Sequence, residues 1–151
     1  MSVVQATCSE ICFGREYIEK AAVEENQYKR LAYCIAHIIQ QSATVKGRKP
    51  VTHPVEGETY ELVTPDFKYT SEMIKKQPFK MACHAEGEAW ELNGAHDMEY
   101  DVTPCKDGGS MRIKPKNVWD FKLKNFNEHI TGKRPELFIW NLAPGIGKTD
   151  A

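Results

Sequence analysis

The N-terminal part of the chain carries apolar residues at the three- and four-residue spacing that is typical of amphipathic helices. Two segments follow this spacing, residues 16–24 and residues 27–43. The apolar positions of the longer segment are Leu31, Cys34, Ile35, Ile38 and Ile39. Gly47 and Pro50 then stop the pattern. We therefore expect a helical region over residues 16–45.

After Pro50 the pattern changes to short segments rich in aromatic and β-branched residues, which are typical of β-strands. The expected strands are residues 58–63, 67–74, 79–86, 88–92, 98–103, 110–114, 118–124 and 137–142. Turn-forming residues separate several of them, at 64–66, 93–97 and 106–109. Because no helical segment interrupts these strands, they predict an α+β fold in which N-terminal helices precede an antiparallel meander over residues 57–142. Residues 143–151 are then a terminal tail.

Composition and length indicate an ordinary globular chain. The 151 residues fit one domain, residues 1–151. The net charge of −1 gives no overall basic field, so we expect no nucleic-acid partner. The N-terminus lacks the basic region of a signal peptide. With no such signal, the five irregularly spaced cysteines favour reduced thiols. We expect a cytoplasmic protein, peripheral at a membrane or held within a large cytoplasmic or organellar assembly.

Residue patterns that would indicate catalysis or metal binding are weak. Cys83 and His84 are adjacent, and neighbours on a strand point to opposite faces, so they are poorly placed to act on one substrate atom. No set of four ligands has the spacing of a zinc site. The tail 144–151 lacks the first glycine of a phosphate-binding P-loop. His37, beside the helical apolar stripe, is predicted as a core or boundary histidine. We expect neither an enzyme nor a metal site.

Two basic clusters remain as candidates. Arg48 and Lys49 follow the second helix, and three lysines flank Pro78, namely Lys75, Lys76 and Lys80. Such groups can hold a phosphate through charge-assisted hydrogen bonds. Lysine and proline also protect exposed strand edges from unwanted pairing. From spacing alone we favour the second interpretation, a solvated strand edge, over a phosphate site.

The order of several motifs resembles the lipid-transfer domain of the oxysterol-binding protein family. The resemblance covers about residues 16–142, and its most specific parts are Gly57-Glu58-Thr59-Tyr60-Glu61 and Ala82-Cys83-His84-Ala85-Glu86. The other matching runs are Arg30-Leu31-Ala32-Tyr33, Gly47-Arg48-Lys49-Pro50, Pro54, Ser71-Glu72 and Pro78. The resemblance implies a lipid-binding or lipid-transfer domain with a large, nearly closed β-barrel.

The chain departs from the family pattern at the lipid head group. The family's paired histidines, which hold the phosphate of phosphatidylinositol 4-phosphate, fall on Lys76 and Gln77. The family's head-group lysine is retained as Lys49, although the run from Lys49 to Pro54 has one extra residue. The resemblance therefore implies Lys49, Lys76 and Gln77 as head-group residues. A lysine supplies charge on a flexible stem rather than a positioned imidazole.

The family's domain is several hundred residues long, so we expect a truncated and divergent member with a partial or incomplete barrel. An open barrel exposes strand edges and an apolar face that must be covered. Trp119, Phe121, Leu123 and Trp140 are the candidate residues for facing a lipid or a partner. Two functions follow. The first is sterol or phospholipid binding or transfer, with no cofactor except a possible bound lipid. The alternative is a structural subunit whose open edges bind other proteins.

Overall fold

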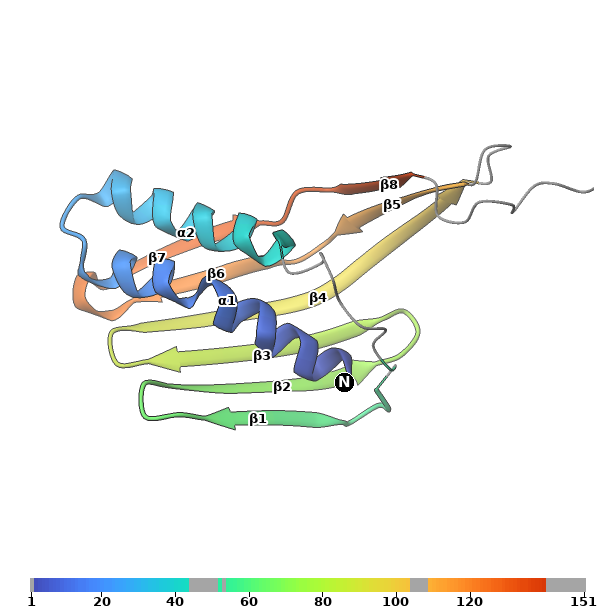
Figure 1. The fold of residues 1–151 in the computed structure, drawn as a ribbon, viewed down its shortest axis with the longest axis horizontal. Helices are drawn as coiled ribbons and strands as arrows, with labels where there is room; N and C mark the ends of the chain where they lie inside the picture. The colour runs from blue at the N-terminus through green and yellow to red at the C-terminus, as the bar shows by residue number, and fades with distance from the viewer. Residues whose placement is uncertain (1, 44–51, 53, 104–108, 141–151) are drawn as a thin grey trace, which may run out of the picture.

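The computed structural model describes residues 2–43, 52, 54–103 and 109–140. Within these residues, two helices precede eight strands, and a short 3-10 helix, η1, follows the sixth strand. The helices are α1 (Val3–Val23) and α2 (Gln27–Ala43). The strands are β1 (Thr59–Val63), β2 (Phe67–Lys75), β3 (Lys80–Gly87), β4 (Trp90–Thr103), β5 (Ser110–Pro115), β6 (Val118–Leu123), β7 (Glu128–Lys133) and β8 (Leu137–Trp140), and η1 is Lys124–Phe126. Figure 1 shows both helices lying side by side across one face of the sheet.

The first helix begins at Val3 rather than at residue 16, so the expected start was wrong. Its sheet-facing side includes the buried residues Val4, Cys8, Ile11 and Ile18. Glu10 interrupts this apolar pattern in the sequence, yet it is also buried. Its carboxylate accepts a hydrogen bond from Arg134 at 3.1 Å. A partner so distant in the chain explains why the sequence pattern concealed the first half of the helix.

The second helix has the predicted bounds. The Asn26 side chain accepts hydrogen bonds from the backbone N–H groups of Tyr28 and Lys29, which fixes where α2 begins. Only part of the expected apolar stripe faces the core. Cys34 and Ile38 are buried, whereas other members remain exposed, namely Leu31, Ile35 and Ile39.

Every strand pair is antiparallel, but the strands branch at β4 instead of forming a simple meander. The main path runs β1-β2-β3-β4-β5-β8. The first part of β4, Trp90–Asn93, also pairs with β6, which pairs with β7. The second part, Met98–Thr103, pairs with β5, which pairs with β8. The described strands form an open sheet, so the α+β prediction with an incomplete barrel is confirmed while the meander order is corrected.

The expected turn at residues 93–97 is wrong, because these residues lie inside β4. They continue the ladder with β3, where Cys83 is opposite Gly94. A Cβ atom at Gly94 would lie 2.4 Å from Cζ3 of Trp119. The glycine therefore permits the close approach of an indole ring and does not mark a chain reversal. The two strands expected at 88–92 and 98–103 are one long strand.

The seventh strand was missed in the sequence. Its residues are mostly polar, with Ile130 as its one large apolar side chain. The left-handed backbone of Asn127, with φ of 48°, reverses the chain before it. A Cβ atom at Gly132 would lie 2.4 Å from Cδ1 of Ile38 in α2, so this strand also supports the helical layer.

The core lies between the helices and the sheet. Trp119, Phe121 and Leu123 of β6 have no exposed surface and belong to this core. The structure therefore corrects the expectation that these three residues face a lipid or a protein partner. Trp140 lies on β8 and is exposed.

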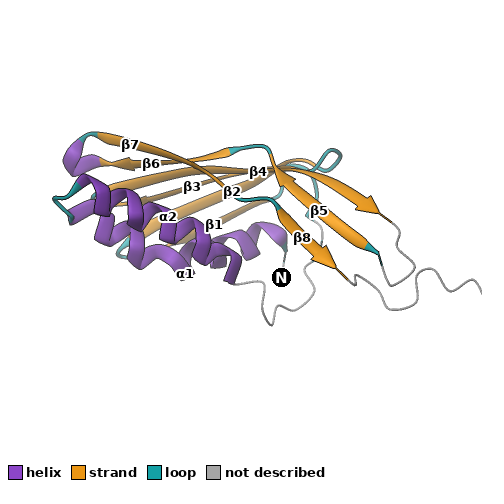
Figure 2. Ribbon diagram, turned by 90° about the horizontal axis from the view of Figure 1, so that it is seen from above, coloured by secondary structure: helices purple, strands orange, loops and turns teal. Residues whose placement is uncertain are grey.

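One part of the sheet extends beyond the helices, as Figure 2 shows for β5 and β8. We call this part the wing. It consists of residues 98–103 of β4 together with β5 and β8. The rest of the sheet, which the helices cover, is called the covered sheet.

Candidate functional site

The wing presents one face made almost wholly of apolar side chains. The strand register places Tyr100 opposite Ile113, which is opposite Leu137. The next row consists of Val102, Met111 and Ile139. Residues directly opposite one another share a face, so these six side chains form one surface, which we call the open face. Tyr100 is 48% exposed and Val102 is 65% exposed.

The opposite face of the wing is mainly charged. Lys114 pairs with Asp101 at 2.5 Å, and Lys116 pairs with Glu99 at 3.4 Å. Arg112 forms an ion pair with Glu136 and lies over the Phe138 ring. Phe138 and Trp140 stack on this face, so Trp140 does not contribute to the open face. The wing thus has one apolar face and one mainly polar face, the pattern of an antiparallel sheet that normally packs its apolar face on a core.

The open face continues the core side of the covered sheet. Alternate residues of β4 point to one side. Trp90, Leu92 and His96 on that side are buried. Tyr100 and Val102 follow on the same side, where the helices no longer cover the strand. The open face is therefore an uncovered extension of the core.

The residues predicted for a lipid head group are only partly described. Lys76 and Gln77 are exposed in the turn between β2 and β3, and the Lys76 backbone N–H donates to the Glu56 carboxylate at 2.8 Å. Lys49 lies outside the described residues. Lys80 is paired with Asp97 at 3.2 Å. Among the residues that the structure describes, none forms an ion pair with the Lys76 side chain.

The start of α1 lies at this same end of the sheet. Val4 packs against Met73 and Met81, the residues just inside the β2–β3 turn. The backbone N–H of Val3 donates to the carbonyl of Thr52 at 3.3 Å. Thr52 belongs to the run that begins at Lys49. The structure therefore brings a part of that run and the β2–β3 turn to the same helix terminus.

A buried polar cluster joins the helices to the sheet, and sequence reasoning did not identify it. The Arg134 guanidinium donates to Glu10 of α1 and to Gln41 of α2. It also contacts His96 at 3.3 Å and lies over the Trp119 ring, with 4.8 Å to the centroid. No spacing rule connects residues this far apart. Arg134 precedes β8, so the cluster anchors the wing to the helical layer.

The adjacent Cys83 and His84 point to opposite faces of β3. Cys83 is buried and donates to the carbonyl of Gly94, whereas His84 contacts Asn93 on the outer face. Burial raises the pKa of the Cys83 thiol to about 12, which keeps it protonated. Within the described part of the chain, no three His, Cys, Asp or Glu residues are grouped for a metal ion. No described helix is long and apolar enough to cross a membrane.

Two helices that cover part of one face of an open antiparallel sheet define an α+β fold. A model of the oxysterol-binding protein family matches residues 1–150. The chain therefore belongs to the oxysterol-binding protein family, which confirms the resemblance seen in the sequence.

Curated relatives agree with this assignment. The chain is 29% identical over 150 residues to human oxysterol-binding protein-related protein 3, covering 96% of this chain and 16% of that protein. It is 36% identical over 124 residues to oxysterol-binding protein-related protein 1D of Arabidopsis thaliana, covering 80% of this chain and 14% of that protein. The chain thus spans about a sixth of the length of these relatives.

Two solved structures have the same fold. The Osh1 ORD domain in complex with ergosterol has a TM-score of 0.77 at 20% identity, covering 91% of this chain and 34% of that one. The Osh3 ORD from Saccharomyces cerevisiae, in complex with PI(4)P, has a TM-score of 0.76 at 21% identity, covering 97% of this chain and 39% of that one. The chain therefore corresponds to a little more than a third of a solved domain.

Proposed function

We propose that this chain binds lipid, with the open face in contact with the hydrocarbon of a sterol or phospholipid. The proposal rests on one observation. The six side chains of the open face lie in two rows on the same side of the sheet as the core, and no described helix covers them. A contiguous apolar face that other elements leave exposed is a candidate surface for binding a ligand or a partner. The ergosterol and PI(4)P complexes of the two similar structures support lipid as its occupant.

The head group of such a lipid belongs at the β2–β3 turn in this proposal. Lys76 supplies positive charge and Gln77 supplies an amide, and Lys49 is the third proposed residue. A lysine ammonium binds phosphate through charge-assisted hydrogen bonds. The proposal places the protein in the cytoplasm, peripherally at a membrane, with lipid as its one bound small molecule. Transfer between membranes is part of the same proposal.

The first test measures lipid on the purified full chain and its affinity for a fluorescent sterol. Val102→Asp places a carboxylate on the open face, where contact with hydrocarbon would strip it of water. We expect at least a tenfold loss of sterol affinity. Ser110→Asp, at the margin of the same wing but on its charged face, is the matched control and should change affinity less than twofold.

A second pair of measurements distinguishes the contribution of the head-group contacts to binding from that of the hydrocarbon contacts. Lys76→Ala should weaken binding to vesicles containing phosphatidylinositol 4-phosphate and leave sterol affinity unchanged. Purified chain without lipid and without sterol binding would refute the proposal. Equal effects of Val102→Asp and Ser110→Asp would also refute it, and would favour protein subunits as the cover of the wing.

A further inference from the structure

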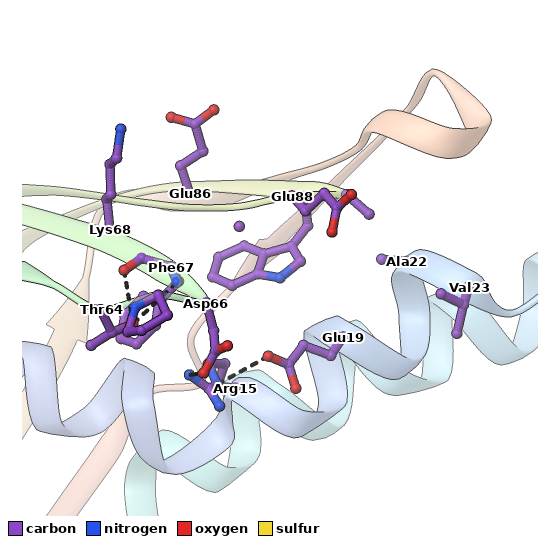
Figure 3. Close-up of a pocket in the computed structure, with 14 residues that line it drawn as sticks. Arg15, Glu19, Ala22, Val23, Thr64, Asp66, Phe67, Lys68, Glu86 and Glu88 are labelled. Carbon is purple, nitrogen blue, oxygen red and sulfur yellow. Dashed lines mark hydrogen bonds and ion pairs between the residues drawn. The ribbon is translucent and has the colours of Figure 1, made fainter.

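A second site lies at the end of the sheet far from the head-group turn. A cleft of about 810 Å³ opens between α1, the β1–β2 turn and the β3–β4 turn. Figure 3 shows the side chains that line it. β3 runs from the β2–β3 turn at Lys80 to this cleft at Gly87, a path of about 24 Å at roughly 3.4 Å per residue. The cleft is therefore separate from the proposed lipid site.

The lining of the cleft carries more acidic than basic groups. Its four carboxylates come from Glu19, Asp66, Glu86 and Glu88, against two cationic side chains, Arg15 and Lys68. Arg15 is already neutralised, because it pairs with Glu19 at 3.0 Å and with Asp66 at 3.7 Å, and Glu86 is paired with Lys124 at 2.8 Å. Glu88 is exposed and has no ion-pair partner among the described residues. Figure 3 shows Glu88 and Glu19 on opposite sides of the cleft.

The floor of the cleft is aromatic and offers one hydrogen-bond donor. Phe67 and Trp90 stack with ring centroids 6.4 Å apart. Trp90 is only 3% exposed, yet its indole N–H has no acceptor among the residues that the structure describes. The indole nitrogen of Trp90 is not fully buried, so its N–H can be reached from the cleft. A Cβ atom at Gly87 would lie 2.5 Å from the indole nitrogen, so glycine is needed for this position of the ring.

We propose that this cleft binds a lysine or arginine residue of a protein segment. The cationic group lies between Glu88 and Glu19, where excess negative charge complements it. The backbone carbonyl of the bound residue accepts the Trp90 N–H, which satisfies a nearly buried donor. The aliphatic stem packs on the aromatic floor. An anionic lipid head group fits this site poorly, because carboxylates outnumber cations in its lining and the Glu88 carboxylate has no ion-pair partner among the described residues.

The test follows the Trp90 indole N–H signal by NMR in the full chain. The probe is N-acetyl-lysine methylamide, and N-acetyl-norleucine methylamide is its uncharged control. We expect a saturable shift of the Trp90 signal with the lysine probe and at least a fivefold weaker response with norleucine. Comparison with a Trp90→Phe spectrum identifies the signal among the three tryptophans.

A matched pair of variants tests the charge. Glu88→Gln should weaken binding of the lysine probe by about threefold to fivefold, the usual size of one exposed charge pair. Glu72→Gln, an exposed carboxylate on β2 outside the cleft, should leave it unchanged. The proposal is overturned if the lysine and norleucine probes act alike or if Glu88→Gln has no effect. It is also overturned if glycerophosphocholine shifts the Trp90 signal and the lysine probe does not. Sterol binding is measured separately, so failure here leaves the lipid proposal unaffected.

Discussion

The covered sheet and the wing share one strand but differ in what lies over their apolar sides. On β4, Leu92 and Val102 point to the same side of the sheet. Leu92 lies under the helices and has no exposed surface, whereas Val102 is 65% exposed. The alternation of apolar and polar residues is equally regular around both. The pattern of a strand thus reveals which side is apolar, and the neighbouring elements decide whether that side becomes core or binding surface.

The sharpest test of this comparison truncates the same kind of side chain in both parts. Leu92→Ala should lower the free energy of unfolding by about 2–5 kcal/mol, because it removes buried methyl groups and leaves a cavity. Val102→Ala should change it by less than about 0.5 kcal/mol, because the valine is largely exposed. Urea unfolding followed by circular dichroism measures both values. Similar losses for the two variants would mean that the wing is packed in solution.

A pH titration tests how well the helical layer excludes water. His37 is buried; its ring contacts the carbonyl of Gly14 at 3.0 Å and the Gln41 side chain at 2.8 Å. Burial lowers its pKa from 6.5 to about 4. The neutral form of His37 is thus favoured in the folded chain. Its contribution to the unfolding free energy is fully present above pH 6.5. Between pH 6.5 and 4 the unfolding free energy should fall by about 3 kcal/mol.

His37→Gln provides the matched experiment for that titration. This variant should lose the component of the pH dependence between 6.5 and 4, whatever its stability at neutral pH. His129→Gln, at an exposed position on β7, should retain it. An unchanged pH profile in His37→Gln would show that the pKa of His37 does not differ between the folded and unfolded chain.

Cysteine alkylation gives the smallest effect, a difference in labelling rate without loss of stability. The Cys8 and Cys12 sulfur atoms lie 3.8 Å apart, and the hydrogen bond from Cys8, helped by Arg15, lowers the pKa of Cys12 to about 7. Burial raises the pKa of both Cys34 and Cys83 to about 12. Iodoacetamide at pH 7 should therefore label Cys12 before Cys34 and Cys83, at a rate that rises as pH increases through about 7.

Peptide mass spectrometry follows each labelled site separately, and Cys12→Ser removes the rapid labelling of the peptide that contains residue 12. Equal labelling of Cys12 and Cys83 in the folded chain would contradict the burial of Cys83 between the sheet and the helices.

Much of the fold could be predicted because it follows from local patterns. The bounds of α2 and most strands came from apolar spacing and turn residues. The errors occurred where a residue forms a hydrogen bond or a packing contact with a residue that is distant in the chain. Gly94 looks like a turn residue until Trp119 is placed against it, and Glu10 looks like a surface residue until Arg134 reaches it.

The candidate sites followed the same division. The resemblance directed attention to Lys76 and Gln77, which are exposed in the turn between β2 and β3, and their role at a head group stays a prediction. It did not indicate the cleft around Trp90, because α1 and the two turns that form it are far apart in the chain. The need to cover an open barrel led us to assign Trp119, Phe121 and Leu123 to a ligand or partner, although they are core residues.

The sequence by itself determined the class of fold, the family and the apolar side of most strands, because these depend on residue spacing and on motifs read in order. Only the tertiary structure decided which apolar residues are covered. Two helices shield β6 and the first part of β4, and they end before the wing. Burial depends on the elements that lie across a surface, and that information is not contained in the periodicity of any single strand.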